Sequence, residues 1–394
     1  MTLANHLNLV ALVGALPWIA TPIIATFRMS RSTFLYDESP EPPPNAPLVT
    51  VIVPARNEAR NIEACLRSIL ASSYPRLQLI AVDDHSTDGT GTIAREVAAM
   101  DSRLMVLDNP ALPVDWFGKQ WACQTGANAA SGEILIFMDA DARASVDLVT
   151  RSVNGMLRLG ADFYSVLGRQ EMVTFWERIL QLQVFTVLMT RFGGTEIINR
   201  TKKATAKIAN GQYLMVRRAS YDEFGGHALV RGYVAEDLML AQRYFELGKK
   251  TVLVMGRDQL TTRMYTSLAE LIRGWRKNLY AGGRHSMPLG NRAAVLAPLL
   301  IPLPFVMQLA PPVALLFAIL FGMPVLQLWA GISTGVTLLS WIVYYRLADL
   351  PEWYALLYPL GAAMTLYIVL SATIRGSRVE WKGREYESVR PASA

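Results

Sequence analysis

Ile134-Leu135-Ile136-Phe137-Met138-Asp139-Ala140-Asp141 is the stretch of the chain that decides its fold. Five consecutive apolar residues are too few for a typical helix and are typical of a strand buried on both faces. Two carboxylates follow, one residue apart, where the strand ends. Open α/β sheets bind ligands beyond the carboxyl ends of their strands. A pair of Asp side chains there can present oxygen ligands to a hard divalent cation.

Strand and helix patterns alternate along the chain before this stretch. The segments expected as strands are 48–53, 77–82 and 104–107, and those expected as helices are 62–70, 90–100 and 119–130. A strand–helix–strand order predicts an α/β domain with a mostly parallel, doubly wound sheet and right-handed crossovers.

The ends of the chain are apolar. The protein has 394 residues, of which 52% are hydrophobic and 18% charged, and its mean hydropathy is +0.24. Residues 1–27, 293–345 and 353–374 contain no Asp, Glu, Lys or Arg. A spanning helix needs about 20 mostly apolar residues, so the sequence predicts one N-terminal and three to four C-terminal transmembrane helices.

These patterns divide the chain into five parts. We expect an N-terminal transmembrane anchor (1–30), a proline-rich linker (31–47), a water-facing α/β domain (48–285), C-terminal membrane segments (293–375) and a basic tail (376–394). Within the domain, residues 172–205 hold an apolar helix with charges near its start. This helix lies either in the membrane interface or in the core of the domain.

Basic residues next to the apolar segments indicate the orientation. Arg28, Arg31, Arg284 and Arg292 flank the domain and predict that it faces the cytoplasm, as a multi-pass protein of the cell membrane. A net charge of +6 favours contact with an anionic membrane surface. Nucleic acid is the poorer explanation of this charge, because the basic residues are not gathered in one aromatic-studded patch, and we expect no nucleic-acid partner. No obligatory protein partner is expected.

The side of the basic tail is the least settled part of this topology. Three C-terminal spans would place the tail outside, whereas Arg375, Arg378, Lys382 and Arg384 favour the cytoplasm. Four short crossings, or one re-entrant segment, would reconcile the two. We expect a cytoplasmic tail.

Five motifs occur in order along the chain. They are Val51-Ile-Val-Pro-Ala-Arg-Asn-Glu58, Val82-Asp-Asp-His-Ser-Thr-Asp-Gly-Thr90, Gly118-Lys-Gln-Trp-Ala122, Asp139-Ala-Asp141 and Ala235-Glu-Asp237. Together they resemble the family 2 glycosyltransferases with a GT-A fold. The layout is similar to the membrane-anchored lipid branch, which includes ceramide glucosyltransferases and the hopanoid- and carotenoid-type glycosyltransferases.

The resemblance implies a role for each matching residue. Those expected around a nucleotide-sugar donor are Pro54, Arg56, Glu58, Asp83, Asp84 and Lys119. Asp139 would touch the ribose or a metal, and Asp141 would ligate Mg²⁺ or Mn²⁺. Asp237, with Glu236 beside it, would be the general base of an inverting transfer.

Each of these residues also has a purely structural explanation. Asp83 and Asp84 lie in a turn-rich segment, where Asp often caps the backbone. Glu236 and Asp237 open a predicted helix, where the helix dipole favours carboxylates. A lysine in the position of Lys119 is more often an ordinary solvated surface residue. The functional interpretation therefore depends on the ordered set of motifs rather than on any single residue.

One motif departs from the family pattern. The family often has Gln or Arg, two residues, and then Arg-Trp beside the diphosphate, whereas this chain has Glu270-Leu-Ile-Arg273-Gly-Trp275-Arg276-Lys. Either Arg273 or Arg276 could take the phosphate-binding role. Trp275 either stacks near the acceptor or anchors its helix at the membrane interface.

The sequence therefore predicts an enzyme that moves a sugar from a nucleotide-sugar, by analogy UDP-glucose, to a membrane lipid acceptor. The candidate acceptors are ceramide-like, carotenoid, hopanoid or diacylglycerol lipids, and the product is a glycolipid. The alternatives are a processive polysaccharide synthase and a non-catalytic nucleotide-sugar-binding membrane protein. A transporter fits less well, because its spans would be expected to carry ionisable groups.

Overall fold

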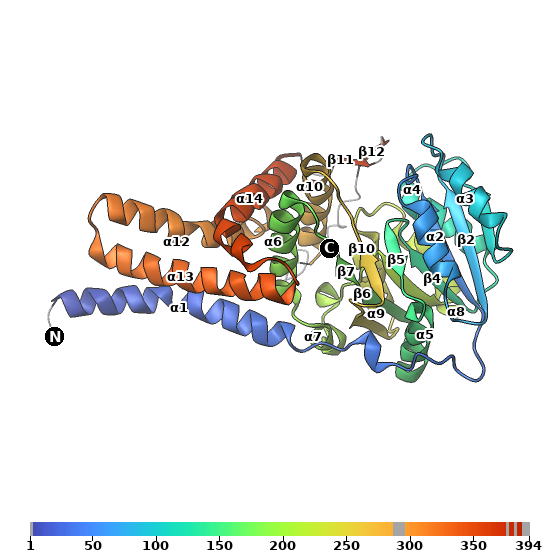
Figure 1. The fold of residues 1–394 in the computed structure, drawn as a ribbon, viewed down its shortest axis with the longest axis horizontal. Helices are drawn as coiled ribbons and strands as arrows, with labels where there is room; N and C mark the ends of the chain where they lie inside the picture. The colour runs from blue at the N-terminus through green and yellow to red at the C-terminus, as the bar shows by residue number, and fades with distance from the viewer. Residues whose placement is uncertain (1–2, 287–295, 376–377, 382–383, 388–394) are drawn as a thin grey trace.

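The computed structural model describes residues 3–286, 296–375, 378–381 and 384–387. An α/β domain occupies one end of the molecule and a bundle of long helices the other (Figure 1). The central sheet has the strand order β3-β2-β1-β4-β8-β6-β9. These strands are β1 (Val49–Ala55), β2 (Leu77–Asp83), β3 (Leu104–Asp108), β4 (Ile134–Met138), β6 (Phe163–Leu167), β8 (Tyr213–Arg217) and β9 (Thr251–Met255).

The sheet is mostly parallel, as predicted. Strands β3, β2, β1 and β4 run parallel to one another. Strand β8 runs antiparallel to both β4 and β6, and β9 is parallel to β6. All five residues of β4 are buried, which explains the uninterrupted apolar run before Asp139. The predicted α/β fold class is therefore confirmed.

Helices cover both faces of the sheet. One apolar layer forms against α2 (Ile62–Leu70), α3 (Thr90–Ala98) and α5 (Leu148–Leu159). The other forms against α4 (Gly118–Ala129), α8 (Arg218–Glu223) and α9 (Glu236–Glu246). Helix α4 sits close to β1 because Gly126 has no side chain: a Cβ there would lie 2.4 Å from Ile52 Cγ2. This close packing sets the distance between α4 and β1.

A second, three-stranded sheet begins directly after the acidic pair. Its strand order is β5 (Ala142–Ala144), β10 (Leu260–Thr262) and β7 (Arg169–Gln170). Asp139 and Asp141 thus lie in the short turn between the end of β4 and the start of β5. Strands on both sides hold that turn in place.

In the part of the chain that the structure describes, four helices are long and apolar enough to cross a membrane: His6–Met29, Ala297–Leu320, Pro324–Leu347 and Glu352–Ile374. They comprise α1 (Leu3–Met29), α11 (Ala297–Leu300) with α12 (Leu303–Leu320), α13 (Pro324–Leu347) and, after a 3₁₀ turn, α14 (Tyr358–Arg375). One lies before the domain and three after it, which agrees with the predicted count.

Three of these helices run together, and the fourth does not. Helices α1, α12 and α13 extend side by side away from the domain (Figure 1). Helix α14 instead packs across α6 (Phe175–Phe192) and α10 (Leu268–His285), at the domain end of the bundle. The remaining elements are the short helix α7 (Thr195–Arg200) and a hairpin of β11 (Arg378–Trp381) and β12 (Arg384–Glu387).

A proline in α12 creates a contact between the long helices. Pro311 has no N–H, so it cannot bond to the carbonyl of Met307 one turn earlier. The indole of Trp18 in α1 donates a hydrogen bond to that carbonyl at 2.9 Å. Trp18 also packs edge-on against Trp329 of α13, with ring centroids 5.2 Å apart. One side chain therefore joins three helices.

We predict that Trp18→Phe lowers the free energy of unfolding by about 1 kcal/mol, because the Met307 carbonyl loses its donor in an apolar setting. Thermal unfolding of the purified protein in detergent measures the change. Trp353→Phe is the matched control, since Trp353 is exposed and should tolerate the change. Equal melting temperatures for Trp18→Phe and the wild type would contradict the prediction.

Candidate active site

A cavity of about 1610 Å³ lies where the domain meets the long helices. One part of its wall is ionic and comes from the carboxyl edge of the sheet and from the start of α9. This part includes Glu58, Lys119, Asp139, Asp141, Glu236 and Asp237. Another part is apolar and comes from α6 and α11 to α13, including Leu182, Phe185, Leu188, Ile301, Phe305 and Leu347. A polar reaction site and an apolar surface are thus continuous.

Lys119 forms ion pairs with two carboxylates of the ionic wall. Its Nζ lies 2.7 Å from Asp139 Oδ1 and 2.7 Å from Glu236 Oε1. Desolvation alone would lower the pKa of Lys119, but the two carboxylates outweigh it and raise the pKa well above its ordinary value. The lysine therefore stays charged and ties the start of α4, the end of β4 and the start of α9 to one point.

The two partners of Lys119 respond differently to their surroundings. Desolvation raises the pKa of Asp139 by more than Lys119 lowers it. For Glu236, desolvation is outweighed by Lys119 and Lys277, and the pKa is lowered. Glu236 therefore carries a firmly held negative charge next to Asp237.

Asp141 has an oxygen without a protein partner. Its Oδ1 is buried and accepts no hydrogen bond from the described residues. Desolvation, together with Asp139 and Glu58, raises the pKa of Asp141 to about 8. An unsatisfied carboxylate beside a second carboxylate fits a hard divalent cation such as Mg²⁺ or Mn²⁺. Among the described residues no group of three His, Cys, Asp or Glu is placed to enclose a metal, so further ligands would come from substrate phosphates and water.

Asp237 is held by the backbone and faces the cavity. Its Oδ2 accepts a hydrogen bond from the N–H of Gly211 at 2.9 Å, and its Oδ1 accepts one from Leu238 at 2.8 Å. Desolvation and the neighbouring charge of Glu236 raise the pKa of Asp237 to about 6. A carboxyl group with a pKa near neutrality is suited to act as a general base.

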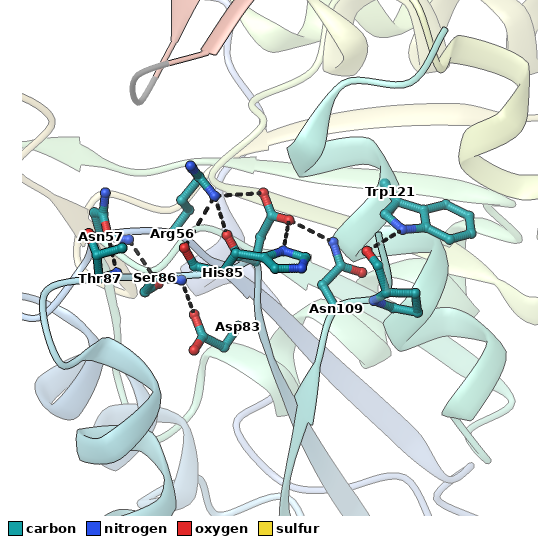
Figure 2. A network of polar contacts seen from close by, with 10 residues as sticks. Arg56, Asn57, Asp83, His85, Ser86, Thr87, Asn109 and Trp121 are labelled. Carbon is teal, nitrogen blue, oxygen red and sulfur yellow. Dashed lines mark hydrogen bonds and ion pairs between the residues drawn. The ribbon is translucent and has the colours of Figure 1, made fainter. Parts of the chain in front are cut away.

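A separate polar network surrounds Asp84, which follows β2. Figure 2 labels three of its members, Arg56, His85 and Asn109. The side chain of Asp84 is buried and accepts a hydrogen bond from Asn109 Nδ2 at 3.0 Å. Arg56 Nη1 donates to the backbone carbonyl of Asp84 at 2.5 Å and lies 3.8 Å from its carboxylate. His85 Nδ1 lies 3.3 Å from the same carboxylate. Asp84 is thus a fixed, buried acceptor at the edge of the cavity.

Asp83 lies in a different place from its neighbour. Its Oδ1 accepts a hydrogen bond from the N–H of Ser86 at 3.1 Å, and the residue does not line the cavity. Figure 2 shows the side chain of Asp83 directed at Ser86, in the turn after β2. Pro54, Arg56 and Glu58 do line the cavity, so the structure brings them together with Asp84.

Helix α10 separates the two candidate arginines. Arg273 lines the cavity, whereas Arg276 Nε donates to Ser371 Oγ of α14 at 3.0 Å and does not line it. Trp275 is 5% exposed and packs edge-on against Phe185, with ring centroids 5.5 Å apart. Trp275 therefore joins α10 to α6 while its remaining surface reaches the cavity wall.

Sequence reasoning missed two residues of this region. Lys277 lines the cavity and lies one helical turn after Arg273, a spacing that could have pointed to it. Asn109 directly follows β3 at the same carboxyl edge of the sheet as Asp84. This position could also have identified it as a candidate site residue.

The domain has a GT-A-like α/β fold with a mostly parallel sheet. Residues 50–225 match the family model described as Glycosyl transferase family 2. The predicted resemblance to the family 2 glycosyltransferases is thus confirmed over this segment, which is somewhat less than half of the chain.

Curated relatives and solved structures agree with this assignment. The chain is 26% identical over 243 residues to a 4,4'-diaponeurosporenoate glycosyltransferase of Staphylococcus haemolyticus, and the match covers 61% of this chain and 63% of the relative, less than two thirds of its length. A relative of the same name from Staphylococcus aureus strain MRSA252 is 26% identical over 352 residues, which cover 87% of this chain and 89% of the relative.

A solved structure resembles nearly the whole chain. The mannosyltransferase PcManGT from Pyrobaculum calidifontis, in complex with GDP-Man and Mn²⁺, superposes with a TM-score of 0.54 at 19% identity. The superposition covers 94% of this chain and 98% of PcManGT. At this identity the likeness is one of fold, and it includes the long helices as well as the domain.

We predict that Asp141→Asn stabilises the metal-free protein. The raised pKa of Asp141 means that the folded state binds more protons than the unfolded state between about pH 4 and pH 8. Wild-type stability therefore falls as the pH rises through this window. The variant should gain about 1 kcal/mol at pH 8, after allowance for solvent screening, and nothing near pH 4. Thermal unfolding with a chelator present, with surface Asp222→Asn as the control, measures the gain; a loss at pH 8 would contradict it.

Proposed function

We propose that this protein is an inverting glycosyltransferase that moves a sugar from a nucleotide-sugar to a membrane lipid and so makes a glycolipid. The observation that carries the proposal is the shared cavity, in which the ionic site of the domain opens onto an apolar wall formed by the long helices. A water-soluble donor and a lipid acceptor could meet there without either leaving its own environment.

The donor would bind over the carboxyl edge of the sheet. Asp84 offers a fixed carboxylate to the N–H group of a base, and Arg56 and Glu58 lie beside it on the wall. Asp139 and Asp141 would hold Mg²⁺ or Mn²⁺ next to the diphosphate. When bound, such a cation neutralises charge on the leaving diphosphate. PcManGT was solved with GDP-Man and Mn²⁺, so GDP-sugars belong beside UDP-glucose among the candidate donors.

Asp237 would act as the general base. As the acceptor oxygen forms its bond to the anomeric carbon, the bond from that carbon to the phosphate oxygen breaks. Where the acceptor is a hydroxyl, Asp237 accepts the proton that the hydroxyl gives up; a carboxylate acceptor is already deprotonated and attacks without this transfer. Attack from the face opposite the leaving group inverts the anomeric centre. Glu236, held by Lys119 at 2.7 Å, keeps the pKa of Asp237 near the working pH.

The acceptor would be a lipid with a long hydrocarbon chain. The curated relatives act, by their names, on 4,4'-diaponeurosporenoate, which makes a carotenoid-type acceptor the first to test. Ceramide, hopanoid and diacylglycerol lipids are the others. The apolar wall from α6 and α11 to α13 is the surface on which the chain would lie.

We predict that Asp237→Asn lowers sugar transfer to a hydroxyl-bearing lipid by about 10²–10⁴-fold, the usual contribution of a general base, and leaves nucleotide binding within about twofold. In the wild type, activity should rise with pH through about 6, because Asp237 must lose its proton to act. Membranes containing the protein, supplied with labelled UDP- and GDP-sugars and candidate lipids, provide the assay.

The matched control is Asp222→Asn, which removes a surface carboxylate on α8. Full transfer by Asp237→Asn would remove this residue from its role. Nucleotide-sugar binding without transfer to any lipid, even in the wild type, would favour the non-catalytic alternative. Labelled polymer in place of labelled lipid would favour a polysaccharide synthase.

The proposed location is the cell membrane, with the α/β domain and the basic tail both facing the cytoplasm. Helix α14 supports this topology because it packs on α6 and α10, which carry Glu177, Arg178, Arg273 and Lys277. Such charges are costly in the hydrocarbon core. With α12 and α13 as the crossings after the domain, the chain returns to the domain's side before α14 and stays there.

We predict that a green fluorescent protein fused after residue 394 fluoresces, and that alkaline phosphatase fused there is inactive, because both would remain in the cytoplasm. Fusions at Gly322, in the turn between α12 and α13, are the matched control and should give the opposite pair of results. Active alkaline phosphatase at residue 394 would show that α14 crosses the membrane.

A further inference from the structure

A row of carboxamide side chains lies on the cavity wall, between the proposed metal site and the proposed base. It consists of Gln170, Asn210 and Gln212, all of which line the cavity. Gln212 directly precedes β8, which pairs antiparallel with β4. The start of β8 therefore lies beside the end of β4, next to the turn that carries the acidic pair.

The backbone of this segment contacts both ends of the acidic site. The N–H of Gly211 donates to Asp237 Oδ2 at 2.9 Å, and the carbonyl of Gln212 accepts a hydrogen bond from the N–H of Asp139 at 3.3 Å. During transfer, the anomeric carbon of a sugar must lie between the leaving phosphate and the attacking oxygen. The proposed metal and base sit at these two ends, so the sugar ring would lie along Gly211 and Gln212.

The side-chain amide of Gln212 is held in one orientation. Asn210 Nδ2 donates to the backbone carbonyl of Val166 at 2.8 Å, which fixes the Asn210 amide. The same nitrogen donates to Gln212 Oε1 at 3.3 Å, and Gln170 Nε2 donates to that oxygen at 2.8 Å. Turning the Gln212 amide over would place its NH₂ group against two other donors. Gln212 Oε1 is therefore directed at the row, and Nε2 away from it.

The nitrogen of the same amide remains available to a ligand. Gln212 is only 5% exposed, and its Nε2 donates to none of the residues that the structure describes. This nitrogen keeps some exposed surface, since it is not one of the sealed atoms without a partner, and the side chain lines the cavity. An N–H group that is fixed before the ligand arrives loses little freedom when it binds a ligand oxygen.

We propose that Gln212 determines sugar specificity: its Nε2 donates a hydrogen bond to one hydroxyl oxygen of the sugar that is transferred. Gln170 and Asn210 are positioning residues, which hold the amide in the required orientation. The inference rests on the proposed function and deepens it, because it names the group that selects the sugar. Two epimers hold the same hydroxyl in different places, and a fixed donor meets only one of them. A site built to hydrogen-bond a substrate hydroxyl also discriminates against an analogue that lacks it.

The test removes one partner from the protein and the other from the ligand. Purified full-length protein in detergent with Mn²⁺, without acceptor lipid, is titrated with UDP-glucose and its monodeoxy analogues, and in parallel with GDP-mannose and its analogues. Gln212→Met keeps the length of the side chain but has no N–H. It should weaken binding of the preferred nucleotide-sugar by about three- to tenfold, as expected for one neutral hydrogen bond. One deoxy analogue, which lacks the contacted hydroxyl, should bind equally to the wild type and to Gln212→Met.

The free nucleotides and two further variants provide the controls. Binding of UDP and GDP by Gln212→Met should stay within about twofold of the wild type, which also shows that the variant is folded. Gln170→Met removes a donor that holds the Gln212 amide, and should narrow the difference in affinity between UDP-glucose and its epimer UDP-galactose. Gln327→Met should bind every ligand as the wild type does, because Gln327 donates to the Ala318 carbonyl at 2.8 Å and does not line the cavity.

Several results would overturn the assignment. One is an equal loss of UDP and UDP-sugar affinity in Gln212→Met, and another is a loss of the same size for every deoxy analogue. Unchanged nucleotide-sugar affinity with reduced transfer would place the amide at the acceptor instead. Failure of the wild type to bind any nucleotide or nucleotide-sugar would overturn the proposed function, and the role of Gln212 with it.

Discussion

The ion triad of Lys119 with Asp139 and Glu236 is the interaction on which the candidate site depends. The three residues come from separate elements, and the lysine lies 2.7 Å from each carboxylate. Without the lysine, two partly desolvated carboxylates would face each other across the cavity, and their repulsion would push the end of β4 away from the start of α9. The distance between the proposed metal site and the proposed base is therefore set by one ammonium group.

The triad also divides the acidic residues into two kinds. Asp139 and Glu236 have a cation in contact, whereas Asp141 keeps a buried oxygen that accepts no hydrogen bond from any residue the structure describes. Asp237 is held by two backbone N–H groups. The pKa values of Asp141 and Asp237 are raised to about 8 and about 6. Residues that differ by one or two positions in the chain thus have different partners. Asp141 and Asp237 are the two that we propose for binding a metal and for accepting a proton.

Much of the fold could be predicted from the sequence because its signals are local. The apolar run before Asp139 predicts the buried strand β4, and the charge-free segments predict the four long helices. Side-chain direction could not be predicted in the same way. Asp83 and Asp84 are adjacent in one motif, yet one caps a turn and the other reaches the cavity. Likewise, Arg273 and Arg276 looked equivalent until the packing of α10 against α14 became visible. Lys277 was overlooked because the motif pattern ends before it, whereas the helix continues.

The contact of Arg276 with Ser371 has a consequence for how the protein senses its surroundings. It ties α10 to α14, and α14 in turn packs against α12 and α6. The helix that carries Arg273 and Lys277 on the cavity wall is thereby braced by α12, one of the helices long and apolar enough to cross a membrane. Lateral pressure and bilayer thickness would act on α12 first, and we expect the bracing to pass any resulting tilt to α10. Affinity for a water-soluble ligand at this site should then depend on the lipid environment, so a micelle and a bilayer are not equivalent settings for measuring it.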